Sequence, residues 1–277
     1  MIEEKARRIR VNIIKAIGAA GSGHPGGSLS CADILAVLYF HAMRIDPKRP
    51  DWEDRDKFIM SKGHAAPALY AALAEAGYFP VEELLTLRKL GSRLQGHPDM
   101  KKTPGVEIST GSLGQGLSAA NGMAIAAKLD KKDTRIYVLL GDGELEEGQV
   151  WEAAMTSVHR KLDNLMAFVD YNGLQIDGSV EDVKSLKAVG EKWRAFGWHV
   201  MGIDGHDIRQ IMTAIDEAKQ IKGKPTVAVA RTVKGKGVSF MEGGVDWHGK
   251  APNRDQVYKA LVELGERIVD GGGVVNG

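Results

Sequence analysis

The sequence predicts an α/β protein with a mostly parallel sheet and helices on both faces. After residue 135, short apolar segments of strand composition alternate with segments of helical periodicity. These intervening segments are long enough for the helical crossovers that join parallel strands. Glycine accounts for 34 of the 277 residues, about 12% against a usual ~7%, so we expect many tight turns or close backbone approaches.

Composition excludes several classes of protein. The 37 Lys and Arg residues against 36 Asp and Glu leave no basic excess to hold nucleic acid. A single cysteine cannot form an internal disulfide. The charged start lacks the apolar region of a signal peptide, and no apolar run reaches the ~18 residues of a membrane span. We therefore expect a cytoplasmic protein with no nucleic-acid or membrane partner.

The chain has no Pro/Ser-rich linker, so we expect one domain over residues 1–265 and a flexible Gly-rich tail over 266–277. In the first half, apolar residues at helical spacing predict a helix over 2–19, followed by a glycine-rich loop. Ser30 is the expected cap of a helix over 31–43. A strand over 57–60 and helices over 65–77 and 81–90 follow.

The second half is more regular. Strands are predicted over 135–140, 165–170, 198–203 and 226–230, with helices over 146–162, 185–196 and 206–221. Right-handed crossovers place the carboxyl ends of parallel strands at one edge of the sheet. Ligands of such folds bind at that edge, so we sought chemistry in the loops there.

Gly141-Asp142-Gly143 directly follows the predicted strand 135–140. Asn172 follows the next predicted strand, and 28 residues lie between Gly143 and Asn172. This spacing places Asp142 and Asn172 at the ends of two parallel strands that we expect to be neighbours. Carboxylate and amide oxygens suit Mg²⁺ or Ca²⁺. The alternative is an ordinary strand-to-helix turn in which Asp142 caps the helix.

A second glycine loop spans residues 109–116 and precedes a helix rich in small residues. Free N–H groups at such a helix start favour an anion. Gly-x-Gly patterns at 21–26 and 114–119 raise the possibility of a dinucleotide site. The first follows a helix and the strand after the second ends in Gly-Asp-Gly, so both contexts argue against NAD. The basic stretch 234–237 could touch a phosphate or be a solvated turn, and we expect the turn.

Four of the eight histidines lie in turn-like segments beside glycine: His24, His64, His97 and His248. Four such residues in one domain suggest a site that needs neutral donors and acid/base groups. We expect the others (His41, His159, His199 and His206) to be structural. Without a Cys/His cluster, zinc is not expected. Cys31 is assigned to packing, and the helix dipole explains most of the acids at 144–152.

Together these motifs resemble the N-terminal thiamine diphosphate domain of transketolase. The resemblance is carried by G-D-G with Asn172, S-G-H-P-G, S-K-G-H-A, G-S-R-L-Q-G-H-P and S-T-G-S-L-G-Q-G, in the family's order, over about residues 5–255. It implies a thiamine diphosphate-binding fold. It also implies that Asp142, Asn172 and the carbonyl of Leu174 hold Mg²⁺, with Ca²⁺ or Mn²⁺ as substitutes.

The resemblance implies further roles. Gly143, Gly111, Leu113 and His64 would contact the cofactor, and Glu147 would join an acidic network that couples cofactor sites. His24, His97 and His248 would face the sugar. Two local departures are Ser112, where the family often has proline, and the segment around His248, which differs from the family's usual histidine-rich loop.

A complete transketolase is more than twice as long as this chain. Its second domain binds the pyrimidine of the cofactor and grips the sugar phosphate. We therefore interpret the chain as the N-terminal subunit of a split transketolase of the pentose phosphate pathway. It would act with a C-terminal subunit in a homodimer of heterodimers on sugar phosphates. The alternatives are the alpha-type subunit of a thiamine-dependent 2-oxo acid dehydrogenase and a non-catalytic thiamine diphosphate-binding protein.

Overall fold

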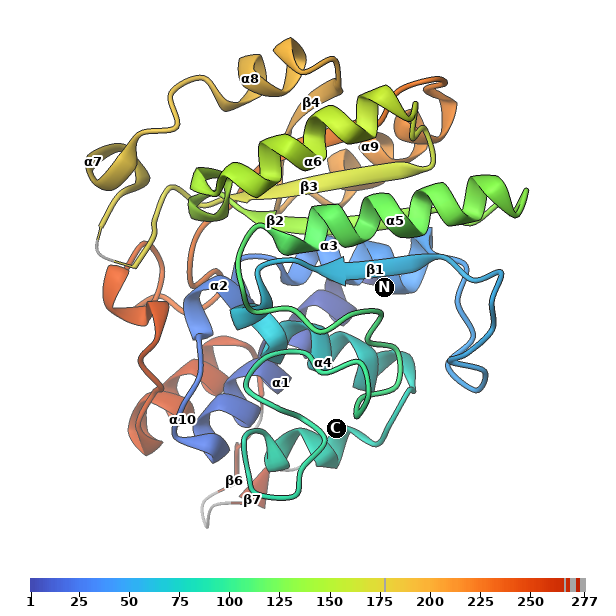
Figure 1. Ribbon diagram of the computed structural model, residues 1–277. Coiled ribbons are helices and arrows are strands. Elements are labelled where there is room, and N and C mark those ends of the chain that lie inside the picture. The colour runs from blue at the N-terminus through green and yellow to red at the C-terminus, as the bar shows by residue number, and fades with distance from the viewer. Residues whose placement is uncertain (177, 267, 270–272, 275–277) are drawn as a thin grey trace.

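The computed structural model describes residues 1–176, 178–266, 268–269 and 273–274. Its centre is a five-stranded sheet in the order β1-β2-β3-β5-β4, with every neighbouring pair parallel (Figure 1). The strands are β1 (Lys57–Met60), β2 (Ile136–Gly141), β3 (Leu165–Tyr171), β4 (His199–Asp204) and β5 (Thr226–Arg231). The predicted parallel sheet is confirmed, with strand ends shifted by at most one residue.

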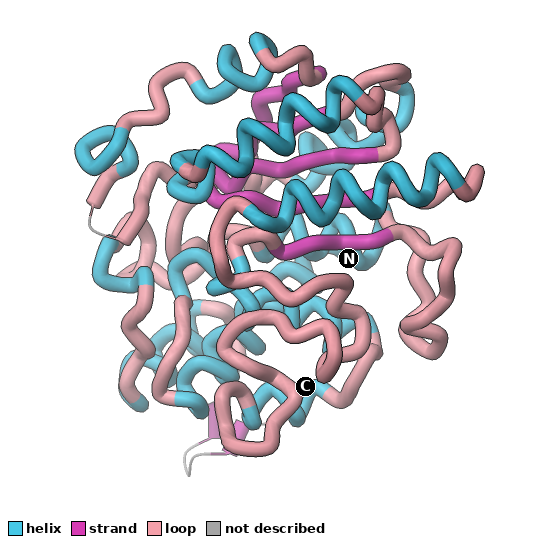
Figure 2. Tube along the Cα trace, viewed as in Figure 1, coloured by secondary structure: helices cyan, strands magenta, loops and turns pink. Residues whose placement is uncertain are grey.

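Helices cover both faces of the sheet, as predicted (Figure 2). One face carries α5 (Gln115–Leu129), α6 (Gly148–His159) and α8 (Val189–Ala195). The other carries α3 (Ala32–Val37) and α9 (Ile208–Gln220), with α1 (Ile2–Ala20) and α4 (Ala66–Ala76) packed against α3. Side chains alternate between the two faces: Tyr137 and Leu139 join the α1/α3 core, whereas Val138 and Leu140 join the α5/α6 core.

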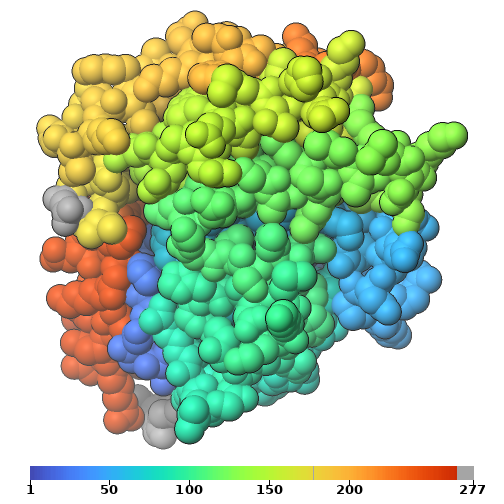
Figure 3. Space-filling model, in the orientation of Figure 1, coloured from blue at the N-terminus to red at the C-terminus, as the bar shows by residue number. Residues whose placement is uncertain are grey.

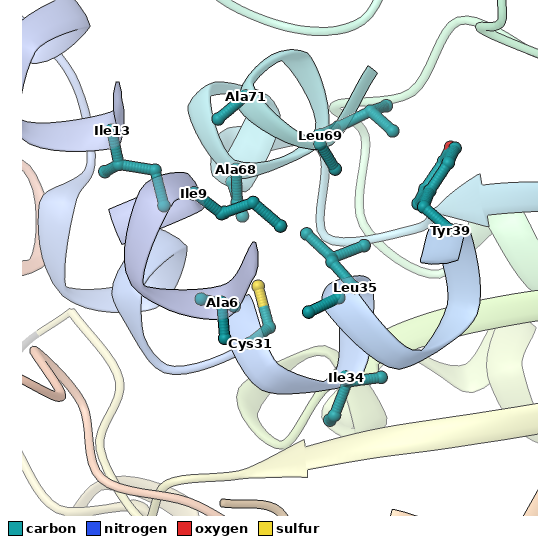
Figure 4. Close-up of a cluster of buried hydrophobic side chains, with 14 of the residues drawn as sticks. Ala6, Ile9, Ile13, Cys31, Ile34, Leu35, Tyr39, Ala68, Leu69 and Ala71 are labelled. Atoms are coloured by element: carbon teal, nitrogen blue, oxygen red, sulfur yellow. The ribbon is translucent and has the colours of Figure 1, made fainter. Parts of the chain in front are cut away.

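The larger core depends on close helix packing. Figure 4 shows Ile9 of α1 and Leu35 of α3 near Ala68 and Leu69 of α4. Residues 66–74 are all buried within this chain, and the alanines among them let the helices approach closely. The Ala-rich segment 65–76 therefore serves internal packing. Cys31 is fully buried in the same core, and burial raises the pKa of its thiol to about 11.

Two predicted helices differ from the structure. Ser30 is not the N-cap of α3: its hydroxyl donates to Asp170 at 2.6 Å, and Cys31 takes the N-cap position without a side-chain bond. Helix α3 then passes into a π-helical turn, η1 (Leu38–Ala42). The segment 81–90 forms only a 3-10 helix, η3 (Val81–Thr86), because the chain turns at Arg88, where φ is +60°.

Other helices are shorter than predicted or were not predicted. The 3-10 helices η2 (Gly63–Ala65) and η4 (Gly143–Glu146) precede α4 and α6. The elements not predicted from the sequence include α2 (Pro25–Leu29), α7 (Val180–Lys184), η5 (Val245–His248) and α10 (Arg254–Glu263). Helix α10 begins with a capping box between Asn253 and Gln256, a signal present in the sequence.

The chain end forms a short antiparallel pair, β6 (Ile268–Val269) with β7 (Gly273–Val274). The rest of the predicted flexible tail, residues 267, 270–272 and 275–277, lies outside the described residues. The long connection from η3 to α5, coloured teal to green, covers the lower front of the molecule (Figure 3). None of the described helices has both the length and the apolar character needed to cross a bilayer.

Candidate functional site

The ends of β2 and β3 are joined through the side chain of Asp142. Gly141 of β2 is in register with Asp170 of β3, so the two following turns lie side by side. The carboxylate of Asp142 accepts hydrogen bonds from the N–H of Gly143 at 2.8 Å and from that of Gly173 at 2.6 Å. The predicted proximity of Asp142 to the turn that contains Asn172 is confirmed.

These turns present oxygen atoms around a buried negative charge. Asp142 is only 3% exposed, and burial, followed by the nearby charge of Asp170, raises the pKa of its carboxyl to about 6. The amide oxygen of Asn172 accepts from the N–H of Leu174 at 3.1 Å, and both residues border the same cleft. A desolvated carboxylate beside amide and carbonyl oxygens fits a hard divalent cation. Within the described residues, no cluster of three or more His, Cys, Asp or Glu side chains offers a zinc-type site.

Three of the four singled-out histidines form one cluster. The ring centroids of His24, His64 and His248 lie 5.3–5.5 Å apart, although the residues come from the loop before α2, from η2 and from η5. Burial lowers the pKa of His24 and His248 to about 4, and that of His64 well below its ordinary value. All three rings are therefore neutral near pH 7. The Nδ1 atom of His24 is buried and has no hydrogen-bond partner among the described residues.

His97 and Glu147 lie outside this cleft. His97 packs behind Gly111, where an added Cβ would lie 3.0 Å from the imidazole Cδ2 and where φ is +150°. Burial, followed by the charge of Arg88, lowers the pKa of His97. Glu147 is exposed at the start of α6 and packs beside Gly114.

The glycine loop 109–116 borders the cleft with Gly111 and Leu113 and ends at Gly114, the N-cap of α5. Its position is fixed by Glu144, which is 2% exposed. The Glu144 carboxylate accepts from the N–H of Gly114 at 2.9 Å and from the hydroxyl of Ser61 at 2.5 Å. This contact was not predicted, because the helix dipole accounts for most of the acids at 144–152 and Glu144 was not singled out. Its position next to Gly-Asp-Gly was the only available signal.

Two buried lysines were also missed. Lys62 forms an ion pair with Asp170 and donates to the carbonyl of Gly27 at 2.6 Å. Lys234, expected in a solvated turn, is 1% exposed, and its Nζ lies 3.1 Å from Nδ1 of His248. Burial lowers the pKa of the Lys234 ammonium to about 8. The prediction of a solvated turn is thus wrong for Lys234.

These groups surround one cleft at the carboxyl edge of the sheet, with a volume of about 240 Å³. Asp142, Asn172, Lys62 and Lys234 all follow strands of the sheet, so the topology brings them to that edge. Of the site residues predicted from the sequence, His24, His64, Gly111, Leu113, Asp142, Gly143, Asn172, Leu174 and His248 line the cleft. The cleft thus combines an oxygen-rich end, two ammonium groups and three neutral imidazoles. Such an arrangement can hold a phosphorylated ligand with a divalent cation.

Comparisons with known proteins agree with this chemistry. Residues 2–268 match the family described as "Transketolase, thiamine diphosphate binding domain". The chain is 49% identical to a 6-deoxy-6-sulfo-D-fructose transketolase subunit of Clostridium sp. strain MSTE9, over 95% of this chain and 96% of that protein. It is 44% identical to an apulose-4-phosphate transketolase subunit of Phocaeicola vulgatus, over 96% and 95% of the two chains.

Longer relatives match the chain over part of their length. Human transketolase is 43% identical over 96% of this chain and 42% of its own length. The crystal structure of transketolase from Campylobacter jejuni superposes with a TM-score of 0.90 at 37% identity, over 95% of this chain and 42% of that one. The chain belongs to the transketolase family and comprises its N-terminal, thiamine diphosphate-binding domain.

Proposed function

We propose that this chain is the diphosphate-binding subunit of a split transketolase. It would transfer a two-carbon ketol unit from a ketose phosphate to an aldose phosphate, with thiamine diphosphate and Mg²⁺. The observation that best supports the proposal is the hydrogen bond from Gly173 to Asp142, because it joins Asp142 to the turn that contains Asn172 and Leu174 beside the histidine-lined cleft.

Different residues would bind the metal ion and the cofactor. Asp142, Asn172 and the carbonyl of Leu174 would hold the divalent cation on the diphosphate, with Mg²⁺ ahead of Ca²⁺ or Mn²⁺. The bound cofactor supplies the carbon that accepts and returns the two-carbon unit. Gly111, Leu113, Gly143 and His64 would contact the cofactor. Glu147 would act outside the cleft, in the acidic network between cofactor sites.

The neutral imidazoles would handle the sugar. His24 lines the cleft with a neutral ring, which suits a hydroxyl group of the substrate. His248 accepts from the ammonium of Lys234 through Nδ1, leaving Nε2–H as a donor. His97, which packs behind Gly111, would also face the sugar. Neutral rings can accept or donate protons at sugar hydroxyls without a prior change of charge.

A partner chain would complete the active site. Two relatives named as transketolase subunits align over nearly their whole length, while the human enzyme extends well beyond the matched region. We therefore propose a C-terminal subunit that supplies the pyrimidine-binding domain, in a homodimer of heterodimers. The buried, free Cys31 suits a reducing cytoplasm.

The decisive experiment is ketol transfer from xylulose 5-phosphate to ribose 5-phosphate, with Mg²⁺ and thiamine diphosphate. The chain is assayed alone and with the protein encoded beside it. Activity only in the mixture is expected. The relatives' names include a sulfonated sugar and apulose 4-phosphate, so these sugars are tested as second donors.

Other outcomes separate the alternatives. Cofactor binding by calorimetry without turnover on any of these sugars would indicate a non-catalytic binding protein. Decarboxylation of pyruvate without ketol transfer would indicate a subunit of a 2-oxo acid dehydrogenase. The four histidines beside glycine favour the sugar reaction over that alternative.

A further inference from the structure

The loop that follows β5 carries Lys234 into the cleft. The N–H of Gly235 donates to the carbonyl of Gly26 at 3.0 Å, which seats the loop against the segment after His24. The Lys234 side chain then reaches His248, with Nζ 3.1 Å from Nδ1. An added Cβ at Gly26 would lie only 2.9 Å from Cγ of Lys234, so this seat is closely packed.

Keeping the Lys234 ammonium buried costs free energy, so other contacts are needed to hold it in place. Among the described residues, no carboxylate lies within ion-pair distance of Lys234. A buried ammonium without a carboxylate partner loses hydration, and a lysine side chain is long enough to return its charge to water. The loop must therefore be held by contacts outside the cleft.

Two side chains on the far side of the loop provide those contacts. The N–H of Val233 donates to Nε2 of His206 at 2.8 Å, one residue before Lys234. The guanidinium of Arg10 donates through Nε to the carbonyl of Lys236 at 3.1 Å, two residues after Lys234. The loop is thus fixed on both sides of the lysine.

Asp33 joins these two side chains into one network. Its carboxylate accepts from Nδ1 of His206 at 2.7 Å and from both terminal nitrogens of Arg10 at 2.5 and 3.0 Å. Because Nε2 of His206 accepts from Val233, the ring proton of the neutral imidazole must be on Nδ1, where it donates to Asp33. The Asp33 carboxylate therefore fixes both the orientation and the tautomer that the loop requires.

We propose that His206 is a positioning residue that holds the Val233–Lys234 segment so that the Lys234 ammonium stays inside the cleft beside His248. The inference rests on the proposed function in one respect: the Lys234 ammonium lines the cleft in which thiamine diphosphate would bind. His206 itself touches neither the cleft nor its ligands, since it lies between Asp33 and the loop backbone.

The test is a double-variant cycle on the full chain with its partner subunit. His206→Asn keeps a donor for Asp33 and lacks the distant acceptor for Val233. The dissociation constant of thiamine diphosphate is measured by calorimetry at fixed Mg²⁺. We expect an increase of about tenfold, the low end of the effect of removing a supporting contact. In a Lys234→Met background the same substitution should add less than twofold, because the group that it positions is gone.

A second readout needs no cofactor. The ¹⁵N resonance of His248 Nδ1 reports the hydrogen bond from Lys234, and we expect His206→Asn to shift it toward its position in Lys234→Met. His199→Ala, which removes a surface contact to Glu217, is the control and should leave the resonance unchanged. Failure of the wild-type chain to bind thiamine diphosphate would reject the proposed function, while this resonance would still test the role of His206.

Two results would overturn the inference. One is an unchanged His248 resonance in His206→Asn. The other is full additivity of the two substitutions in cofactor affinity. If His206→Asn lowers the thermal midpoint sharply, the cycle is repeated with His206→Gln. Its longer side chain can again accept from Val233, and we expect it to restore the resonance.

Discussion

The carboxylate of Glu144 accepts a hydrogen bond from the backbone N–H of Gly114, at 2.9 Å, across 30 positions of sequence. A second oxygen of the same side chain accepts from the N–H of Gly141 at 3.0 Å. One buried acid thus joins the glycine loop before α5 to the end of β2. The two loops that border the proposed diphosphate site therefore share a single anchor.

We expect Glu144→Gln to destabilise the chain by about 1–3 kcal/mol, because an amide cannot accept at both ends and leaves a buried N–H unpaired. Cofactor affinity should fall as well, since Gly111 and Leu113 lie on the displaced loop. Urea denaturation and calorimetry measure the two effects. Glu152→Gln, on the exposed side of α6, is the matched control. Equal stability of both variants would contradict the anchoring role.

Asn172→Ala should separate cofactor binding from folding. Among the described residues, its side chain makes only local hydrogen bonds, to Leu174 and Asp170, so we expect little change in the thermal midpoint. Affinity for thiamine diphosphate in Mg²⁺ should fall about 10–100-fold, and chelation of the metal should have a similar effect on the wild type. Asn253→Ala is the opposite control: loss of the α10 cap should cost about 1 kcal/mol of stability and no affinity. Unchanged affinity in Asn172→Ala would remove this residue from the metal site.

Gly63→Ala should disturb the cleft through backbone contacts alone. A Cβ at this position would lie 2.6 Å from the nitrogen of Gly111 and 2.7 Å from the carbonyl carbon of Thr110. Neither atom can rotate away, so we expect a loss of about 1–3 kcal/mol together with weaker cofactor binding. Gly122→Ala, within α5 and with open space around its Cβ, should instead be neutral or gain up to about 1 kcal/mol. Thermal unfolding of the two variants gives the comparison.

The neutral imidazoles predict a pH dependence with a definite sign. His24 has a folded pKa of about 4, against about 6.5 in an unfolded chain. Above pH ~6.5 neither state binds the proton, and its contribution to stability is complete. As the pH falls from there toward 4, the unfolded state takes up the proton first, so stability is lost. The change in unfolding free energy between pH 7.5 and 5.5 should be smaller in His24→Gln than in the wild type.

NMR provides a direct check on the same imidazole. The ring of His24 should remain neutral at pH 5.5 in the folded chain, as should that of His248, whose pKa is also about 4. A midpoint near pH 6.5 for either ring would show that the cleft is open to water at that position.

Local patterns were sufficient to predict the sheet. The buried runs around Val138 and Phe168 have strand composition, and their order with helices leaves only a parallel arrangement. The spacing from Gly143 to Asn172 placed the proposed metal ligands at neighbouring strand ends for the same reason. These predictions depend on hydrophobic periodicity and on the number of residues between motifs. Both can be read from short stretches of the sequence.

The errors concern residues whose environment comes from distant segments. Lys234 was assigned to a solvated turn because no local signal shows that His248 lies beside it in the fold. Serine is a residue type common at helix N-caps, but the hydroxyl of Ser30 donates to Asp170, 140 positions away. Tertiary contacts therefore overrode local preference at the residues nearest the cleft.

The rings of His24 and His248 pack edge to face, with centroids 5.5 Å apart, although 248 − 24 = 224 positions separate them in the chain. During synthesis, His24 leaves the ribosome long before His248 is added to the chain. A nascent chain that ends before η5 contains both strand turns of the proposed metal site but lacks His248. Complete lining of the cleft would thus wait until η5 has been synthesised and has docked beside His24.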